Sequence, residues 1–290
     1  MAGNMTGTTQ QINQAVEKLK HIRPAYADIL DFYGRLCHAQ ESSKANISID
    51  PIHISETALV HKREAHFPLI HISDFVIDET ASKTLFKKIC RMAREVSGKM
   101  GDTAESILEV MGNGQMDLPR LFSSLLNEND EYLQSLVNGS IINQEILVAL
   151  TYASIIPSIV LNTQQLSTYI DKDASWEKGY CPICGQMPGF ALLEEPGQRF
   201  FICGFCRYQW LSLRGFCPFC ENRKEKTLAY FYSEAEKEYR VDLCETCGKY
   251  IKTLDMRNTE RIIYLPLEQV ATLHLDIKAK EKGFESGVKV

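Results

Sequence analysis

Eight of the ten cysteines in this 290-residue chain fall in four Cys-x-x-Cys pairs within one late stretch of the sequence. The pairs are Cys181/Cys184, Cys203/Cys206, Cys217/Cys220 and Cys244/Cys247. Such a pair turns back on itself so that both sulfurs face one point, and two pairs supply the tetrahedral set of four thiolates that zinc or iron prefers. The sequence therefore predicts two metal ions, each in a four-cysteine site, around which this stretch must fold.

The cysteine-rich stretch contains one structural unit twice. Strand-like segments at 189–193 and 199–202 flank a turn, and those at 227–232 and 238–243 flank a second turn. We call the tight turn of a Cys-x-x-Cys pair a knuckle. Each unit then follows the order knuckle, hairpin, knuckle and outgoing strand. The repeat favours sequential pairing, with the first two Cys pairs on one ion and the last two on the other. An interleaved pairing is the alternative.

The sequence before the cysteines follows helical periodicity. Asp102 with Glu105 forms a variant capping box that predicts the start of a short helix through Met111. Pro24 is expected to break the first helical stripe. The other helices are predicted at 12–22, 29–36, 82–96, 118–126 and 130–137.

The long apolar segment at 145–156 could form either a membrane span or a buried core helix. Asn143 can cap this helix, and Pro157 is expected to kink or split it. The segment lacks the roughly 18 uninterrupted apolar residues of a membrane span, and it contains Thr151 and Ser154. We therefore predict the buried central helix of a bundle and no membrane span.

Charge and the amino terminus bound the partners and the compartment. The formal net charge is −5, and residues 180–260 carry eleven Lys/Arg and eleven Asp/Glu, whereas a zinc ribbon that grips phosphates should be basic. We expect no nucleic-acid partner. The first ten residues offer no basic and apolar secretory signal, which predicts a cytoplasmic protein. In that reducing compartment, Cys pairs indicate metal binding or redox activity sooner than structural disulfides.

Four thiolates around one ion leave no open coordination position, so we expect no metal-activated water and no enzyme activity. Such a centre can staple a small domain or, with iron, transfer one electron. The ligands do not choose between iron and zinc. Glycine follows the second cysteine at Gly185 and Gly248, but Arg207 and Glu221 stand there in the middle pairs, which predicts looser turns.

The remaining chemically active side chains have simpler interpretations. Cys37 and Cys90 lie on helical stripes and are expected to be buried thiols. Trp210 is expected to pack in the core of the repeat unit. Four histidines in a region without clear periodicity are interpreted as solvated loop residues, namely His53, His61, His66 and His71.

Three segments resemble the family of the formate dehydrogenase accessory protein FdhE. The segment 199–220 reads RFFICGFCRYQWLSLRGFCPFC, and 244–252 reads CETCGKYIK. The segment 267–276, LEQVATLHLD, is similar to that family's C-terminal helix. The specific match covers about 181–283. The chain departs from the family pattern at Gln209, Leu211 and Glu268-Gln269, which puts any partner contact by those side chains in doubt.

The resemblance implies a cytoplasmic, non-catalytic maturation factor that binds the catalytic subunit of formate dehydrogenase before export by the twin-arginine route. It also implies rubredoxin-like or zinc-ribbon centres that can hold iron. The residues that match the family motif outside the cysteines are candidate partner contacts, namely Trp210, Arg214, Tyr250 and Lys252.

The predicted fold class is α+β, with a helical N-terminal domain, tandem rubredoxin-like modules and a C-terminal helix. Linker residues are expected at Lys172, Asp173 and Ser175. The predicted domains are 1–176, 177–214, 215–260 and 261–290.

Two other functions use the same cysteines. A dithiol oxidoreductase would exchange its Cys-x-x-Cys thiols, but such pairs usually open a helix after a strand, whereas here they flank predicted hairpins. A zinc-ribbon adaptor for nucleic acid or transcription machinery would bind with a steep salt dependence.

Overall fold

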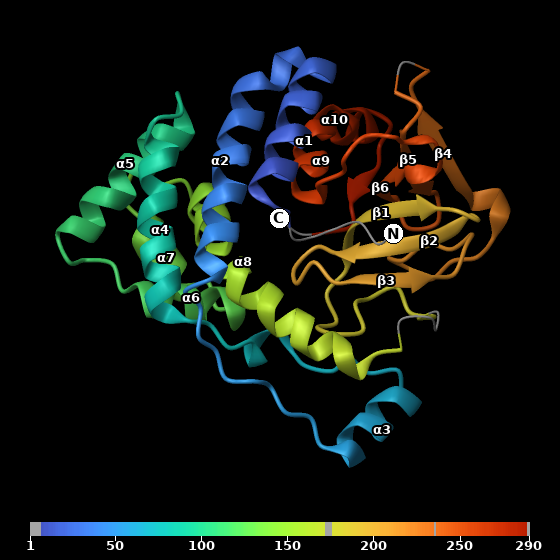
Figure 1. Ribbon diagram of the computed structural model, residues 1–290, viewed down its shortest axis with the longest axis horizontal. Coiled ribbons are helices and arrows are strands. Elements are labelled where there is room, and N and C mark those ends of the chain that lie inside the picture. Colours follow the sequence, from blue (N-terminus) through green and yellow to red (C-terminus); the bar gives the residue numbers. More distant parts are fainter. Residues whose placement is uncertain (1–6, 172–175, 235, 289–290) are drawn as a thin grey trace. The chain divides into compact units, whose positions relative to one another are not determined.

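The computed structural model describes residues 7–171, 176–234 and 236–288 (Figure 1). The chain forms two compact units: a helical unit, which comprises the described residues up to Ile52 and Ile72–Asn162, and a ribbon unit, which comprises His53–His71 and the described residues from Thr163 onward. The α+β class is confirmed. The four domain boundaries inferred from sequence stay predictions, and the expected linker residues Lys172, Asp173 and Ser175 lie outside the described residues.

The helical unit contains the helices that the periodicity predicts. Pro24 ends the first helix and opens a short 3-10 turn, as expected. Asp102 lies inside the first turn of its helix, which begins three residues earlier after Gly98, so the predicted capping box is wrong. The helices are α1 Thr9–Ile22, α2 Ala27–Lys44, α4 Glu79–Arg94, α5 Lys99–Gly112, α6 Leu118–Leu126, α7 Glu131–Val137 and most of α8 Gln144–Leu166.

Helix α8 is the central apolar helix, and Pro157 does not split it. Proline removes the N–H that would bond to the carbonyl of Ala153, four residues earlier. The side-chain amide of the buried Gln40 donates to that carbonyl at 2.8 Å instead. A distant side chain thus satisfies the group that proline leaves unpaired, and the helix continues.

Within the described residues, the helical stretch Gln144–Tyr169 is long and apolar enough to cross a membrane. Its most apolar 18-residue window has a mean hydropathy of 1.8, and 72% of that window is buried inside the protein. Such burial is typical of a core helix in a soluble protein. The start of α8 is capped as predicted, since Asn143 accepts a hydrogen bond from the Ile146 N–H at 3.0 Å.

The ribbon unit is built on one seven-stranded mixed sheet (Figure 1). The spatial order is β3-β2-β1-β6-β5-β4, and the short β7 pairs with β6. Each repeat unit forms an antiparallel meander, as its pattern predicts, and a parallel pairing of β1 with β6 joins the two meanders. The strands are β1 Pro188–Glu194, β2 Gln198–Cys203, β3 Gln209–Ser212, β4 Leu228–Tyr232, β5 Tyr239–Cys244, β6 Lys249–Asp255 and β7 Glu285–Ser286.

The helices of the ribbon unit differ from the sequence prediction. The predicted single C-terminal helix is wrong, because the chain breaks at Thr272 into α9 Leu265–Ala271 and α10 Leu273–Glu281. The Nζ of Lys252 reaches the carbonyl of Gln269 at 3.2 Å, next to the break. The helix α3 Glu56–Glu64 lies in the region where the sequence has no clear periodicity.

Replacing Asn143 with alanine should lower the free energy of unfolding of the helical unit by about 1 kcal/mol, because the first turn of α8 loses its side-chain acceptor. Chemical denaturation followed by circular dichroism measures this loss. Asn138→Ala is the matched control, because Asn138 is exposed at the C-terminal end of α7. An equal loss in both variants would show that the cap does not stabilise α8.

Candidate metal centres

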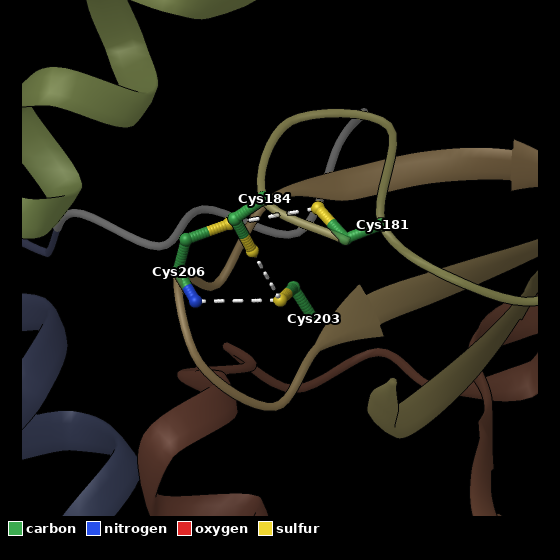
Figure 2. Close-up of side chains that lie close together, drawn as sticks. All are labelled: Cys181, Cys184, Cys203 and Cys206. Atoms are coloured by element: carbon green, nitrogen blue, oxygen red, sulfur yellow. Dashed lines mark hydrogen bonds between the residues drawn. The ribbon is translucent and has the colours of Figure 1, made fainter. Parts of the chain in front are cut away.

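The eight paired cysteines form two groups of four in sequential order. The sulfurs in each group all lie within 4.8 Å of one another. Figure 2 shows the four side chains of the first group pointing toward one another. The interleaved pairing is not what the structure shows. The first thiol group is Cys181, Cys184, Cys203 and Cys206, and the second thiol group is Cys217, Cys220, Cys244 and Cys247.

All four knuckles share one backbone conformation. The residue after the second cysteine of each pair has a positive φ, at Gly185 (74°), Arg207 (63°), Glu221 (55°) and Gly248 (69°). The expectation of looser turns at Arg207 and Glu221 is therefore wrong. The backbones of Arg207 and Glu221 adopt the left-handed conformation that glycine adopts more readily, because the knuckle requires it.

Some backbone N–H groups of the knuckles donate to carbonyls and close the turns, and others donate to a cysteine sulfur. The N–H of Cys181 donates to the Gln186 carbonyl at 2.9 Å, and the N–H of Cys217 donates to the Asn222 carbonyl at the same distance. The N–H groups of Phe205 and Cys206 donate to the sulfur of Cys203 at 3.4 and 3.3 Å. Donors aimed at sulfur stabilise a thiolate, which is the form that binds metal.

The spacing of the sulfurs fits a tetrahedral metal ion. In the first thiol group, Cys181 and Cys206 are 3.6 Å apart at their sulfurs, and Cys184 and Cys203 are 3.5 Å apart. The two corresponding distances in the second thiol group are both 3.7 Å. A zinc–sulfur bond of about 2.3 Å gives a tetrahedral edge of about 3.8 Å. Both groups could thus close around one ion each.

The electrostatics of the thiols also fit a cation. Burial raises the pKa of Cys181 and of Cys206 well above that of a free thiol. Burial acts in the same direction on Cys203, but hydrogen bonds from the neighbouring thiols and from the Cys206 N–H take its pKa well below the ordinary value. A buried cluster cannot carry four thiolates alone, and a divalent cation would neutralise their charge.

The segment that covers the first thiol group has no local signal in the sequence. The N–H groups of Leu69 and Ile70 donate to the carbonyls of Pro182 and Ile183, each at 2.9 Å. These two carbonyls lie inside the first knuckle, far along the chain from the segment that binds them. The segment that follows α3 thus closes one side of the first thiol group.

A buried polar cluster joins the two meanders, and sequence reasoning missed it as well. The guanidinium of Arg199 on β2 donates to Asp242 on β5 at 3.0 Å and to the carbonyl of Phe216 at 3.0 Å. Asp242 also accepts from the Thr253 hydroxyl at 2.7 Å. Arg199 and Thr253 are buried. The cluster therefore holds the two ribbon modules in one register.

The candidate partner contacts lie in different environments. Trp210 is 3% exposed and packs edge-to-face on Phe201, with ring centroids 5.8 Å apart, so its core role is the one that the structure shows. Arg214 is exposed. Tyr250 and Lys252 are buried. Contact of these residues with a client stays a prediction, and burial disfavours it for the residues other than Arg214.

Tyr250 and Lys252 hold the C-terminal helices against the second module. The Nζ of Lys252 lies 2.7 Å from the carboxylate of Asp276 on α10, and the hydroxyl of Tyr250 donates to the same carboxylate at 2.9 Å. Burial lowers the pKa of Lys252, while Asp276 opposes this shift. These motif residues thus have a structural role that needs no partner.

The other candidate side chains agree with their simple interpretations where the structure describes them. Cys37 and Cys90 are buried in the helical unit, and burial raises the pKa of Cys90 to about 12. Only cysteines make up the two candidate metal groups found among the described residues. His61 lies on α3 and is not a loop residue, which corrects the sequence interpretation.

A helical unit joined to two four-cysteine ribbon modules on one sheet defines a metal-binding protein of the zinc-ribbon or rubredoxin-like class. No protein-family model matches the chain. The crystal structure of the FdhE protein from Pseudomonas aeruginosa has a TM-score of 0.68 and 20% identity, with 97% of this chain and 95% of that chain covered. The two proteins thus share their fold.

Curated relatives agree with this likeness. Protein FdhE of Salmonella arizonae is 24% identical over 284 residues, which are 94% of this chain and 84% of the relative. An FdhE homolog of Aquifex aeolicus is 34% identical over 127 residues, but this match spans only 41% of this chain and 44% of the relative. The chain is thus similar to FdhE proteins over most of its length, and more strongly over part of it.

Replacing Lys252 with methionine should lower the free energy of unfolding by about 2 kcal/mol in the absence of any client, because the carboxylate of Asp276 loses its ammonium partner and two carbonyls lose a hydrogen bond from Lys252. Arg214→Ala is the matched control and should change stability by less than about 0.5 kcal/mol, because Arg214 is exposed. Chemical denaturation of the isolated protein measures both values. A fully stable Lys252→Met variant would refute the structural role of this lysine.

Proposed function

We propose that this chain is a non-catalytic, metal-binding accessory protein for formate dehydrogenase. The observation that carries the proposal is the convergence of eight thiols into two groups with the sulfur spacing of a tetrahedral ion. The similarity to FdhE proteins over most of the chain supports formate dehydrogenase as the client enzyme. The chain would bind the catalytic subunit in the cytoplasm before export.

The cysteines themselves define what a bound ion would do. The first thiol group would hold one iron or zinc ion and the second thiol group another. Bound zinc would staple the ribbons, and bound iron would add a one-electron redox couple. Because the four thiolates fill a tetrahedral shell, they leave no position for a substrate or a water. This donor set favours a binding role over metal-assisted catalysis.

The sheet would supply the rigid part of a client-binding surface. Both ribbon modules belong to one sheet through the pairing of Ala191 with Thr253 and of Leu192 with Leu254. Since Arg199 and Asp242 connect the same modules, bound ions would fix a single structure and not two independent knuckles. A preorganised surface lowers the entropy that binding a client costs.

Two observations favour metal binding over dithiol exchange. Within the described residues, none of the four Cys pairs opens a helix, where the helix dipole would activate one thiol. The thiols of the first group are at most 3% exposed, which is too little for attack by a protein disulfide. These features support thiols that serve as ligands.

The double variant Cys203→Ala, Cys206→Ala should lose the ion of the first thiol group and with it the ability to support formate dehydrogenase. Two of four ligands disappear, and the remaining pair cannot close a tetrahedral site. The measurements are metal content by elemental analysis and formate dehydrogenase activity in cells that depend on the variant.

The double variant Cys37→Ala, Cys90→Ala is the control, because these buried thiols lie outside both thiol groups. It should keep both ions and support the enzyme. Normal formate dehydrogenase activity with a Cys203, Cys206 variant that holds no metal would overturn the proposal.

A further inference from the structure

The two thiol groups differ in how far solvent can reach them. In the first thiol group the four cysteines are 0%, 3%, 1% and 0% exposed in chain order. In the second thiol group Cys217 and Cys244 are buried, but Cys220 is exposed and Cys247 is half-buried. Cys184 is the counterpart of Cys220 in the repeat, so the two modules differ most at one equivalent thiol.

The first thiol group is closed by the segment that follows α3. The side chain of Pro68 lies against Gly185, the residue after the first knuckle. The N–H groups of Leu69 and Ile70 donate hydrogen bonds to two carbonyls of the first knuckle. These contacts keep the segment on the first knuckle, and all four cysteines of the first thiol group are buried.

The C-terminal segment and Gly179 both pack against the 217–220 knuckle, and Cys220 is nevertheless exposed. The ring of Phe219 packs against Gly287, and β7 pairs with β6 next to Gly248. On the other side of the chain, Gly179 lies against the carbonyl of Pro218 in the same knuckle. Cys220 and Glu221, where the same knuckle ends, are exposed.

When one cysteine ligand of a closed four-thiolate site is exposed to solvent, metal exchange is expected to begin at that ligand. Such a tetrahedral site has no free position, so exchange begins when an outside donor approaches the ion and one thiolate leaves. The bond from the ion to the incoming donor forms, and the bond to the departing sulfur breaks. The departing thiolate keeps its electron pair and takes a proton from water. The ligand in contact with solvent leaves most easily.

We propose that the second thiol group is a metal-exchange site that opens at Cys220, whereas the first thiol group keeps its ion. The inference rests on the proposed binding of two ions. Its ligand is a thiophilic divalent cation such as Zn²⁺, which enters from or leaves to a small thiolate or nitrogen chelator. The chain would then combine one permanent metal staple with one ion that responds to the metal and thiol content of its surroundings.

Zinc-loaded full-length protein and the chromogenic chelator 4-(2-pyridylazo)resorcinol test the proposal. One zinc per chain should transfer quickly, and the second should transfer at least about tenfold more slowly, since its thiolates are buried. Brief alkylation of the same zinc-loaded protein with iodoacetamide, followed by mass spectrometry, should label Cys220 first and leave the first thiol group unlabelled. The alkylation uses the unsubstituted chain and does not depend on the folding of any variant.

A matched pair of variants assigns the fast phase. Cys220→His keeps a zinc ligand at the exposed position and should change the rate of the fast phase alone, whereas Cys184→His should leave that phase unchanged. Release of both ions at one rate, or first labelling in the 181–206 group, would overturn the exchange proposal while two bound ions would still support the proposed function. A purified chain that binds no metal would instead refute the proposed function.

Discussion

The convergence of thiols into closed groups of four is the constraint on which the ribbon unit depends. A Cys-x-x-Cys knuckle presents both sulfurs when the following residue takes a left-handed conformation, and all four knuckles meet this condition, even where Arg207 and Glu221 replace glycine. Sulfurs held about 3.6 Å apart repel one another once ionised, so a cation is the natural complement. The knuckles also set strand boundaries, because β2 and β5 end at the first cysteine of a knuckle and β3 and β6 begin shortly after its second cysteine.

Merging the two repeat units into one sheet adds a second level of organisation. Each meander alone is a three-stranded ribbon, and the parallel pairing of β1 with β6 places the two most buried strands side by side at the centre. The ion pair between Arg199 and Asp242 crosses this junction and is nearly buried. Because a buried ion pair stabilises only in good geometry, it favours one register of the two modules over others.

Sequence reasoning succeeds wherever the signal is local, and it fails wherever a distant group decides. Cysteine spacing predicts the grouping of the thiols, and periodicity predicts most helices of the helical unit. Local sequence also predicts an interruption of α8 at Pro157, but the amide of Gln40 takes the freed carbonyl. It predicts a continuous C-terminal helix, but Lys252 on β6 binds the carbonyls at the break. No short window of sequence contains both partners of these contacts.

Lys252 also shows why a matching motif does not by itself locate a binding surface. A polar residue shared with a family can contact a partner or can hold the protein's own elements together. The sequence match alone does not distinguish these two roles. Here Tyr250 and Lys252 both bind Asp276, inside the ribbon unit, whereas Arg214 is exposed. A search for the client surface should therefore start from exposed residues of the ribbons, and Arg214 is the motif residue that meets this condition.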